Sequence, residues 1–240
     1  MIFLFNYIKI GIWSTIYYYN PNEIIFDIII KNIKSSGPVL IKLTQWILPK
    51  IEAFYELDDK IMKKIKKIEV LYENCDFHSL ECTEKIYKEE FNKSLIEDYK
   101  EIEEISSGSI GQVYKLTSND DKMFALKVLH PNIKFQIIFY KIIFKIIKKI
   151  RPLKRFINYY FPIDLETFIK DFELQTNFIN EANNNLIFSE IYKNNPNIII
   201  PRLQKISKKM LIMDYEEGII YDKTIFSEYL SWKIISLIKL

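Results

Sequence analysis

A short block of strand-like alternation, at residues 101–129, lies between long stretches of helical periodicity and constrains the fold more than any other feature of the sequence. Its three runs, EIEEIS, IGQVYKL and KMFALKVL, alternate apolar and polar side chains, as strands with one buried face do. Small polar residues separate the runs at 107–109 and at 118–121, and such residues favour tight turns. The block therefore predicts three antiparallel strands.

The flanking segments predict helices and two further strands. Asn22 is placed to cap the first helix, and Pro38 suits the first turn of the next. The runs NIIIPRL at 197–203 and KMLIMDY at 209–215 predict a fourth and a fifth strand. Helical periodicity covers 23–100, 134–150, 164–194 and 227–240. This order indicates an α+β protein with about five antiparallel strands and a long helix between the third and fourth, the layout of a protein-kinase N-terminal lobe.

Two apolar segments fit either a packed helix or a helix at a membrane surface. Residues 1–22 are apolar, but Asn6 and Lys9 interrupt a stretch that is already short of the ~20 residues a spanning helix needs. We therefore expect a packed helix or an interfacial anchor there. The segment 134–150 has Ile and Phe on one face and lysines on the other, so it suits a membrane surface or, more simply, packing against the sheet. These lysines are Lys141, Lys145 and Lys148.

Charge and cysteine usage exclude several classes of protein. A net charge of +3 gives no field that would favour nucleic acid. Cys75 and Cys82 form no disulfide framework, which fits a reducing, intracellular compartment. His78 lies between them, but three ligands at this spacing match no usual zinc pattern, so we expect no metal site.

Three features together could bind a nucleotide. Ser106–Gly111 is a small-residue turn whose backbone can approach phosphate closely, although alone it is an ordinary hairpin turn. Lys127 lies between apolar residues in the third predicted strand, where a buried ammonium needs a partner. Glu181, in the long predicted helix, is a candidate for that partner. An exposed lysine and a solvated glutamate are the alternatives.

Six stretches resemble, in order and spacing, motifs of the UbiB or aarF-domain family of atypical kinases. SIGQVYK resembles the family's SIGQVYRA, FALKVLHPNI its VAVKVQHPGI, and GPVLIKLTQ the GPTFIKLGQ segment with its Lys-x-Gly-Gln motif. FINEANN resembles a Phe-x-x-Glu-Ala-x-Asn helix, and IIIPRL and MLIMDYEEG resemble a Pro-x-Val strand and the hinge. The resemblance covers residues 23–235.

The resemblance implies roles for individual residues. Lys127 matches the ATP-binding lysine and Glu181 the glutamate that pairs with it, while Lys42 and Gln45 match the regulatory signature motif in a helical extension over the active site. The remaining nucleotide contacts fall in the phosphate turn and in the hinge, whose backbone would bond adenine. They are Ser107, Gly108, Ser109, Met213, Asp214 and Tyr215.

The departures from the family pattern bear on activity. Thr44 replaces the signature glycine, and Gln175 and Asn177 replace the two carboxylates of a Glu-x-Asp motif. The segment after the hinge contains one Asp, Asp222, and no His-x-Asp-x-x-x-x-Asn, so we expect no catalytic residue in this chain. ATP would therefore bind weakly, and Mg²⁺ would not be held without a C-terminal lobe.

These expectations define four segments and two functional hypotheses. The segments are an apolar one (1–22), a helical extension (23–100), an N-lobe with hinge (101–218) and the start of a truncated C-lobe (219–240). One hypothesis is an atypical kinase or ATPase N-lobe that cannot transfer phosphate alone and needs its C-lobe or another protein. The alternative is a non-catalytic, pseudokinase-like remnant that binds a partner, a lipid or a membrane. A third class is a helical scaffold with accidental motif matches. We also expect an exposed apolar patch on the cleft side of the sheet and on the last helix.

Overall fold

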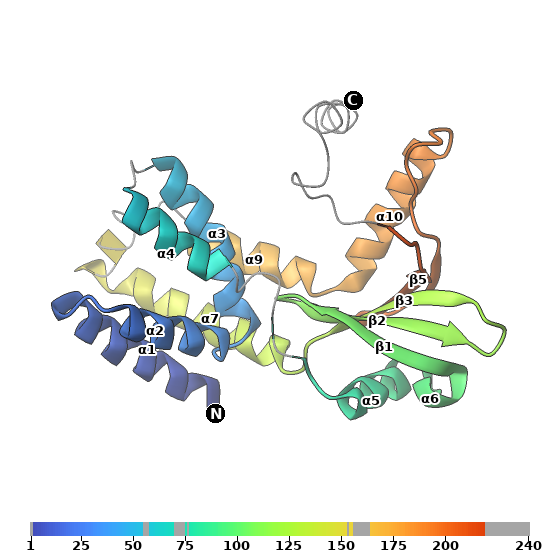
Figure 1. Ribbon diagram of the computed structural model, residues 1–240, viewed down its shortest axis with the longest axis horizontal. Helices are drawn as coiled ribbons and strands as arrows, with labels where there is room; N and C mark the ends of the chain where they lie inside the picture. The colour runs from blue at the N-terminus through green and yellow to red at the C-terminus, as the bar shows by residue number, and fades with distance from the viewer. Residues whose placement is uncertain are drawn as a thin grey trace.

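The computed structural model describes residues 2–54, 58–69, 75, 77–152, 154–155 and 164–218, of which residues 2–4 and 54 are described by their backbone alone. Figure 1 shows a layer of helices beside a curled sheet. The predicted last helix, at 227–240, and the segment 219–240 lie outside the described residues.

Six helices precede the sheet among the residues that the structure describes. Ile24 N donates a 2.7 Å hydrogen bond to Asn22 Oδ1, and the third helix begins at Pro38, as predicted. No helix among the described residues is both long and apolar enough to cross a bilayer. The helices are α1 (Ile2–Tyr19), α2 (Glu23–Lys34), α3 (Pro38–Phe54), α4 (Asp59–Glu69), α5 (Leu80–Phe91) and α6 (Leu95–Asp98).

Five antiparallel strands form one sheet in the order β1-β2-β3-β5-β4. The α+β fold class with a helical extension is therefore confirmed. The strands are β1 (Tyr99–Ser107), β2 (Gly111–Ser118), β3 (Met123–Leu129), β4 (Leu203–Ile206) and β5 (Met210–Asp214). Between β3 and β4 the described helices are α7 (Ile133–Lys149), α9 (Leu165–Gln175) and α10 (Phe178–Tyr192).

The prediction of one long helix over 164–194 is wrong, because the chain breaks at Thr176 and Asn177. Thr176 Oγ1 donates to Glu173 O at 2.7 Å, and Asn177 Oδ1 accepts from Ile179 N at 3.3 Å. Side chains that bond the nearby backbone in this way compete with helix propagation and favour helix ends. Two helices, α9 and α10, therefore replace the single predicted one.

The predicted position of the fourth strand is also wrong. β4 begins at Leu203, whereas the apolar run before it, at 197–202, is not a strand. Pro201 has no N–H to donate to a ladder, and its carbonyl accepts from Asn185 Nδ2 at 3.1 Å. The Ile-rich run predicted a strand because it is hydrophobic. The backbone hydrogen bonds of the sheet, however, begin only at Leu203.

The two faces of the sheet pack against different helices, and this division positions the site. Leu126 and Val128 of β3 belong to a core with α5 and α6, whereas Leu129 and Leu211 belong to a core with α3, α7, α9 and α10. Because successive side chains of a strand point to opposite faces, Lys127 projects toward the α10 face.

Candidate nucleotide site

Lys127 and Glu181 form an ion pair on the α10 face of the sheet. Lys127 Nζ lies 2.7 Å from both carboxylate oxygens of Glu181, and the two side chains are 29% and 40% exposed. The ammonium also lies 5.1 Å from the centre of the Phe178 ring. Lys127 thus has a partner in Glu181, and both side chains are exposed enough to be reached by a ligand.

Glu181 lies in the first turn of α10 rather than well inside a long helix. That turn is held by Asn177, which caps the helix, and by Phe178 N, which donates to Lys208 O at 3.2 Å. Asn177 thus occupies a position where an amide serves well as a cap. Gln175 is the last residue of α9. The start of α10 is therefore fixed to the β4–β5 turn, and with it the carboxylate.

Lys42 of α3 brings a second ammonium near Lys127. Burial lowers the pKa of Lys42, and the positive charge of Lys127 lowers this pKa further. Gln45 is half-buried on the same helix. Thr44, which stands in place of the signature glycine, donates its hydroxyl to Leu40 O at 2.6 Å within α3. The two ammonium groups are therefore close enough to interact, and their combined positive charge suits an anion such as phosphate.

The turn between β1 and β2 is largely covered. Ser107 ends β1 and Ser109 follows Gly108, and the two serines are only 2% and 7% exposed. Gly108 N donates to Gly111 O at 3.0 Å, which closes the turn. The serine hydroxyls are therefore placed inward, and the part of this turn that is suited to contact a phosphate is its backbone.

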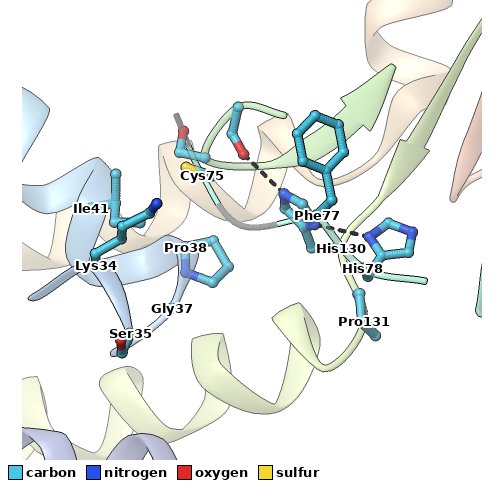
Figure 2. Close-up of a pocket in the computed structure, with 12 residues that line it drawn as sticks. Lys34, Ser35, Gly37, Pro38, Ile41, Cys75, Phe77, His78, His130 and Pro131 are labelled. Carbon is cyan, nitrogen blue, oxygen red and sulfur yellow. Dashed lines mark hydrogen bonds between the residues drawn. The ribbon is translucent and has the colours of Figure 1, made fainter. Parts of the chain in front are cut away.

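A cavity of about 220 Å³ separates the covered side of this turn from the helical extension. Gly37 and Pro38 at the start of α3 line one side, and Ser109, His78 and His130 line the other, as Figure 2 shows for the labelled residues among them. Lys127, Glu181 and the hinge do not line it. The cavity is therefore distinct from the candidate nucleotide site.

Two histidines hold the turn from this side. His130 Nε2 lies 2.9 Å from Gly108 O, and His130 Nδ1 lies 3.1 Å from His78 Nδ1 (Figure 2). A carbonyl only accepts, so His130 carries its hydrogen on Nε2, and its Nδ1 accepts from the N–H of His78. Sequence reasoning gave no role to His130 and considered His78 only as a metal ligand.

The same chain of hydrogen bonds continues into β2. His78 Nε2 then accepts from the Thr83 hydroxyl at 3.0 Å, and the Thr83 oxygen accepts from Tyr114 at 2.8 Å. Gln112 donates to the Tyr114 oxygen, and its carbonyl accepts from His78 N at 2.9 Å. With these donor and acceptor roles both histidines are neutral, and a further proton on His78 Nε2 would reverse the bond to Thr83.

We expect this arrangement to make stability depend on pH. Burial, and then the charge of His130, lower the pKa of His78 from 6.5 to about 4, and burial also lowers the pKa of His130. Since the folded pKa is below the unfolded one, the stabilisation is full above pH 6.5 and is lost as pH falls toward 4. Urea denaturation across that window should show a steeper loss for the wild type than for His78→Gln. Parallel curves for the two proteins would refute the neutral pair.

The hinge residues lie at the end of β5 and directly after it. Met213 and Asp214 end the strand, and Lys115 Nζ lies 4.8 Å from the centre of the Tyr215 ring. Asp214 N donates to Arg202 O at 2.9 Å, and Tyr215 N donates to Met123 O at 3.2 Å. These two N–H groups are thus already bonded, so a hinge donor for adenine would have to come from Glu216 or a later residue.

Glu173 does not take the place of the altered Glu-x-Asp motif as a free carboxylate, because it is paired. Glu173, the carboxylate nearest in sequence to the altered Glu-x-Asp motif, lies 2.6 Å from Lys141 on α7. No group of three His, Cys, Asp or Glu side chains suited to a metal ion occurs among the residues whose positions are described.

Known proteins share parts of this sequence. Residues 70–234 match the family model of the ABC1 atypical kinase-like domain. The probable serine/threonine-protein kinase abkC of Dictyostelium discoideum is 29% identical over 214 residues, 82% of this chain and 28% of that protein. AarF domain-containing protein kinase 1 of Xenopus laevis is 28% identical over 142 residues, 56% of this chain and 26% of that protein. The chain thus spans less than a third of the length of these relatives.

A solved structure from Mycobacterium tuberculosis, the complex of Rv3197 with erythromycin, has a TM-score of 0.46 to this fold at 16% sequence identity. The similarity covers 72% of this chain and 43% of the mycobacterial one.

Proposed function

Because the chain belongs to the ABC1 atypical kinase-like domain family, we propose that its sheet and α10 form the nucleotide-binding half of a kinase-type cleft. The observation that carries this proposal is the ion pair between Lys127 and Glu181, with 2.7 Å between the ammonium and each carboxylate oxygen. In a kinase the third-strand lysine contacts nucleotide phosphates and the helix glutamate holds it in place.

The cleft would bind ATP through five sets of contacts. Lys127 meets the phosphates, and Lys42 adds a second positive charge on the α3 side. Val113 and Ala125, half-buried on the same sheet face as Lys127, form an apolar floor for the adenine. The backbone of the β1–β2 turn approaches the phosphates, and Glu216 or a later residue supplies the hinge N–H. Affinity is low, because the described residues of this half-cleft include no cluster of ligands for a metal that would bridge the phosphates.

Phosphoryl transfer, under this proposal, needs groups that these 240 residues do not supply. A catalytic Asp, an Asn and a metal-binding Asp belong to the other lobe of a kinase. The exposed apolar side chains of α10 are a surface suited to such a partner, whether a C-lobe or another protein. They are Leu186, Ile187, Phe188 and Ile191, exposed by 49–62%. The apolar patch expected on the last helix lies outside the described residues.

Labelling with an acyl-phosphate derivative of ATP tests the proposed cleft. Such a reagent transfers its acyl group to a lysine amine beside the bound phosphates. We expect peptide mapping to find the label on Lys127, with a lesser amount on Lys42, and excess ATP to suppress both. The exposed Lys122 of the β2–β3 turn is an internal control, because its labelling should not respond to ATP. Label on Lys127 that ATP fails to suppress would refute nucleotide binding at this pair.

A further inference from the structure

His130 bonds the β1–β2 turn at two points. Its backbone N–H donates to Ile110 O at 3.0 Å, and its side-chain Nε2 donates to Gly108 O at 2.9 Å (Figure 2). A third carbonyl of the turn, Gly111 O, accepts from Gly108 N at 3.0 Å. In the described part of the chain, by contrast, no group accepts from the N–H of Ser109 or of Ile110. The turn thus has two adjacent N–H groups without an acceptor, and such adjacent donors suit an anion.

His78 orients the ring of His130. The Nδ1 atoms of the two rings lie 3.1 Å apart, and the ring planes are inclined at 81°. Since Nε2 of His130 donates to Gly108 O, its Nδ1 is the acceptor for His78. His78 Nε2 in turn accepts from the Thr83 hydroxyl at 3.0 Å. Each ring therefore makes all its bonds in one tautomer and one orientation, in which the donor of His130 points to the turn.

His78 is itself fixed to the sheet, although it lies outside every helix and strand. His78 N donates to Gln112 Oε1 at 2.9 Å, and Gln112 Nε2 donates to His78 O at 3.2 Å. Gln112 is fully buried in β2. Earlier in the same segment, Cys75 N donates to Ser107 O at 3.1 Å, at the end of β1. The support of the turn is thus built from side chains and backbone whose own positions are fixed.

Packing does not confine the turn at Gly108. A Cβ added there would meet nothing closer than Gly111 O at 3.8 Å, whereas a Cβ on Gly111 would lie 2.2 Å from Val128 O. The turn is therefore tightly packed where β2 begins but open at Gly108. At this open point, the side-chain contact that holds the turn is the hydrogen bond from His130.

We propose that His130, oriented by His78, is a positioning residue that fixes the β1–β2 turn in the conformation that contacts nucleotide phosphates. The inference rests on the proposed function, since it assigns the N–H groups of the turn to the phosphates of that nucleotide. His130 binds Gly108 O on the side of the cavity, so that this carbonyl, whose oxygen would repel a phosphate, is kept away from the ligand. Donors that are already in place also bind more tightly, because less conformational entropy is lost on binding.

Hydrogen exchange at the Gly108 amide tests the positioning directly. Isotope labelling of glycine nitrogen gives a simple spectrum, because the chain contains five glycines. We expect exchange at Gly108 to be about tenfold faster or more in His130→Asn, whose amide can accept from His78 but is one methylene too short to reach Gly108 O. His130→Gln reaches as far as the histidine Nε2 and should keep exchange within about threefold of the wild type.

Calorimetric titration of ATP into the same variants tests the consequence for the site. Affinity should fall about fivefold or more in His130→Asn and stay within about twofold of the wild type in His130→Gln. Tyr87→Phe is the control for lost stability, because it removes a buried hydroxyl that donates to Asp98 at 2.6 Å, away from the turn. It should alter neither exchange at Gly108 nor ATP affinity.

The outcomes separate this proposal from the nucleotide site itself. Equal exchange at Gly108 in the wild type and His130→Asn, or the same acceleration in Tyr87→Phe, would overturn it. So would unchanged ATP affinity in His130→Asn when Lys127→Ala has lost affinity, a result that leaves the nucleotide site standing. No binding of ATP by the wild type would overturn both proposals. Should His130→Asn fail to fold, His130→Phe, which fills the space of the ring and lacks its donor, takes its place with the same expectations.

Discussion

Replacement of Gly111 by alanine is expected to lower the free energy of unfolding by about 3 kcal/mol or more. A Cβ at this position would lie 2.2 Å from Val128 O, 3.0 Å from Val128 C and 3.4 Å from Leu129 Cα. All three are backbone atoms of β3, which cannot turn aside as a flexible side chain can. The strands must therefore separate where Gly111 pairs with Leu129, two residues from Lys127.

Gly108 provides the matched control for this substitution. A Cβ on Gly108 would meet nothing closer than Gly111 O at 3.8 Å, which is ordinary contact, and its φ is not in the left-handed region. Gly108→Ala should change the free energy of unfolding by less than about 1 kcal/mol. Urea denaturation of both variants measures the difference. Equal midpoints for Gly111→Ala and the wild type would show that β2 and β3 are not packed as described.

The parts of the fold that sequence could predict are those set by short-range pattern. Three strands over 101–129 follow from alternation and turn residues, and the structure has β1, β2 and β3 there. The need of a strand lysine for a partner, together with the resemblance to family motifs, allowed a Lys127–Glu181 ion pair to be anticipated, and the side chains do meet. In both cases local chemistry and the sequence order of elements agree.

The parts that sequence misplaced depend on partners elsewhere in the chain. The helix break at Thr176–Asn177 is stabilised by a hydrogen bond from Phe178 N to Lys208 O. No local sequence pattern predicts that bond. The Ile-rich run before β4 is apolar enough for a strand, but Pro201 removes a ladder donor. The role of Tyr215 at the hinge stays a prediction, and its N–H is already bonded to Met123 O.

The histidine pair shows why some interacting side chains are hard to identify from sequence. His78 precedes α5 and His130 follows β3, and only the packing of α5 beneath the sheet brings their rings together. One feature of the sequence pointed to His130, because this residue directly follows β3. Its backbone N–H donates to Ile110 O, which places it beside the β1–β2 turn. Its role depends on the Gly108 carbonyl, which only the structure identifies as the acceptor.

The second large effect concerns Lys127, whose replacement by alanine should weaken ATP binding by about 10- to 100-fold. A charge-assisted hydrogen bond to a phosphate contributes about 1.5–3 kcal/mol, and its loss leaves the Glu181 carboxylate facing the phosphates unneutralised. The variant should still fold, because the Lys127 side chain is 29% exposed and belongs to neither apolar core. Glu181→Gln should have a smaller effect, since it removes the group that positions the lysine rather than the lysine itself.

Calorimetric titration of ATP into the wild type, Lys127→Ala and Lys122→Ala tests most directly whether this sheet and α10 form half of a nucleotide cleft. We predict weak but measurable binding by the wild type, the same binding by Lys122→Ala, whose lysine is exposed in the β2–β3 turn, and a loss of at least about tenfold in Lys127→Ala. Thermal melts of the three proteins are the control, since an unchanged midpoint would show that lost binding by Lys127→Ala is not caused by unfolding. Equal affinities for the wild type and Lys127→Ala would contradict the account.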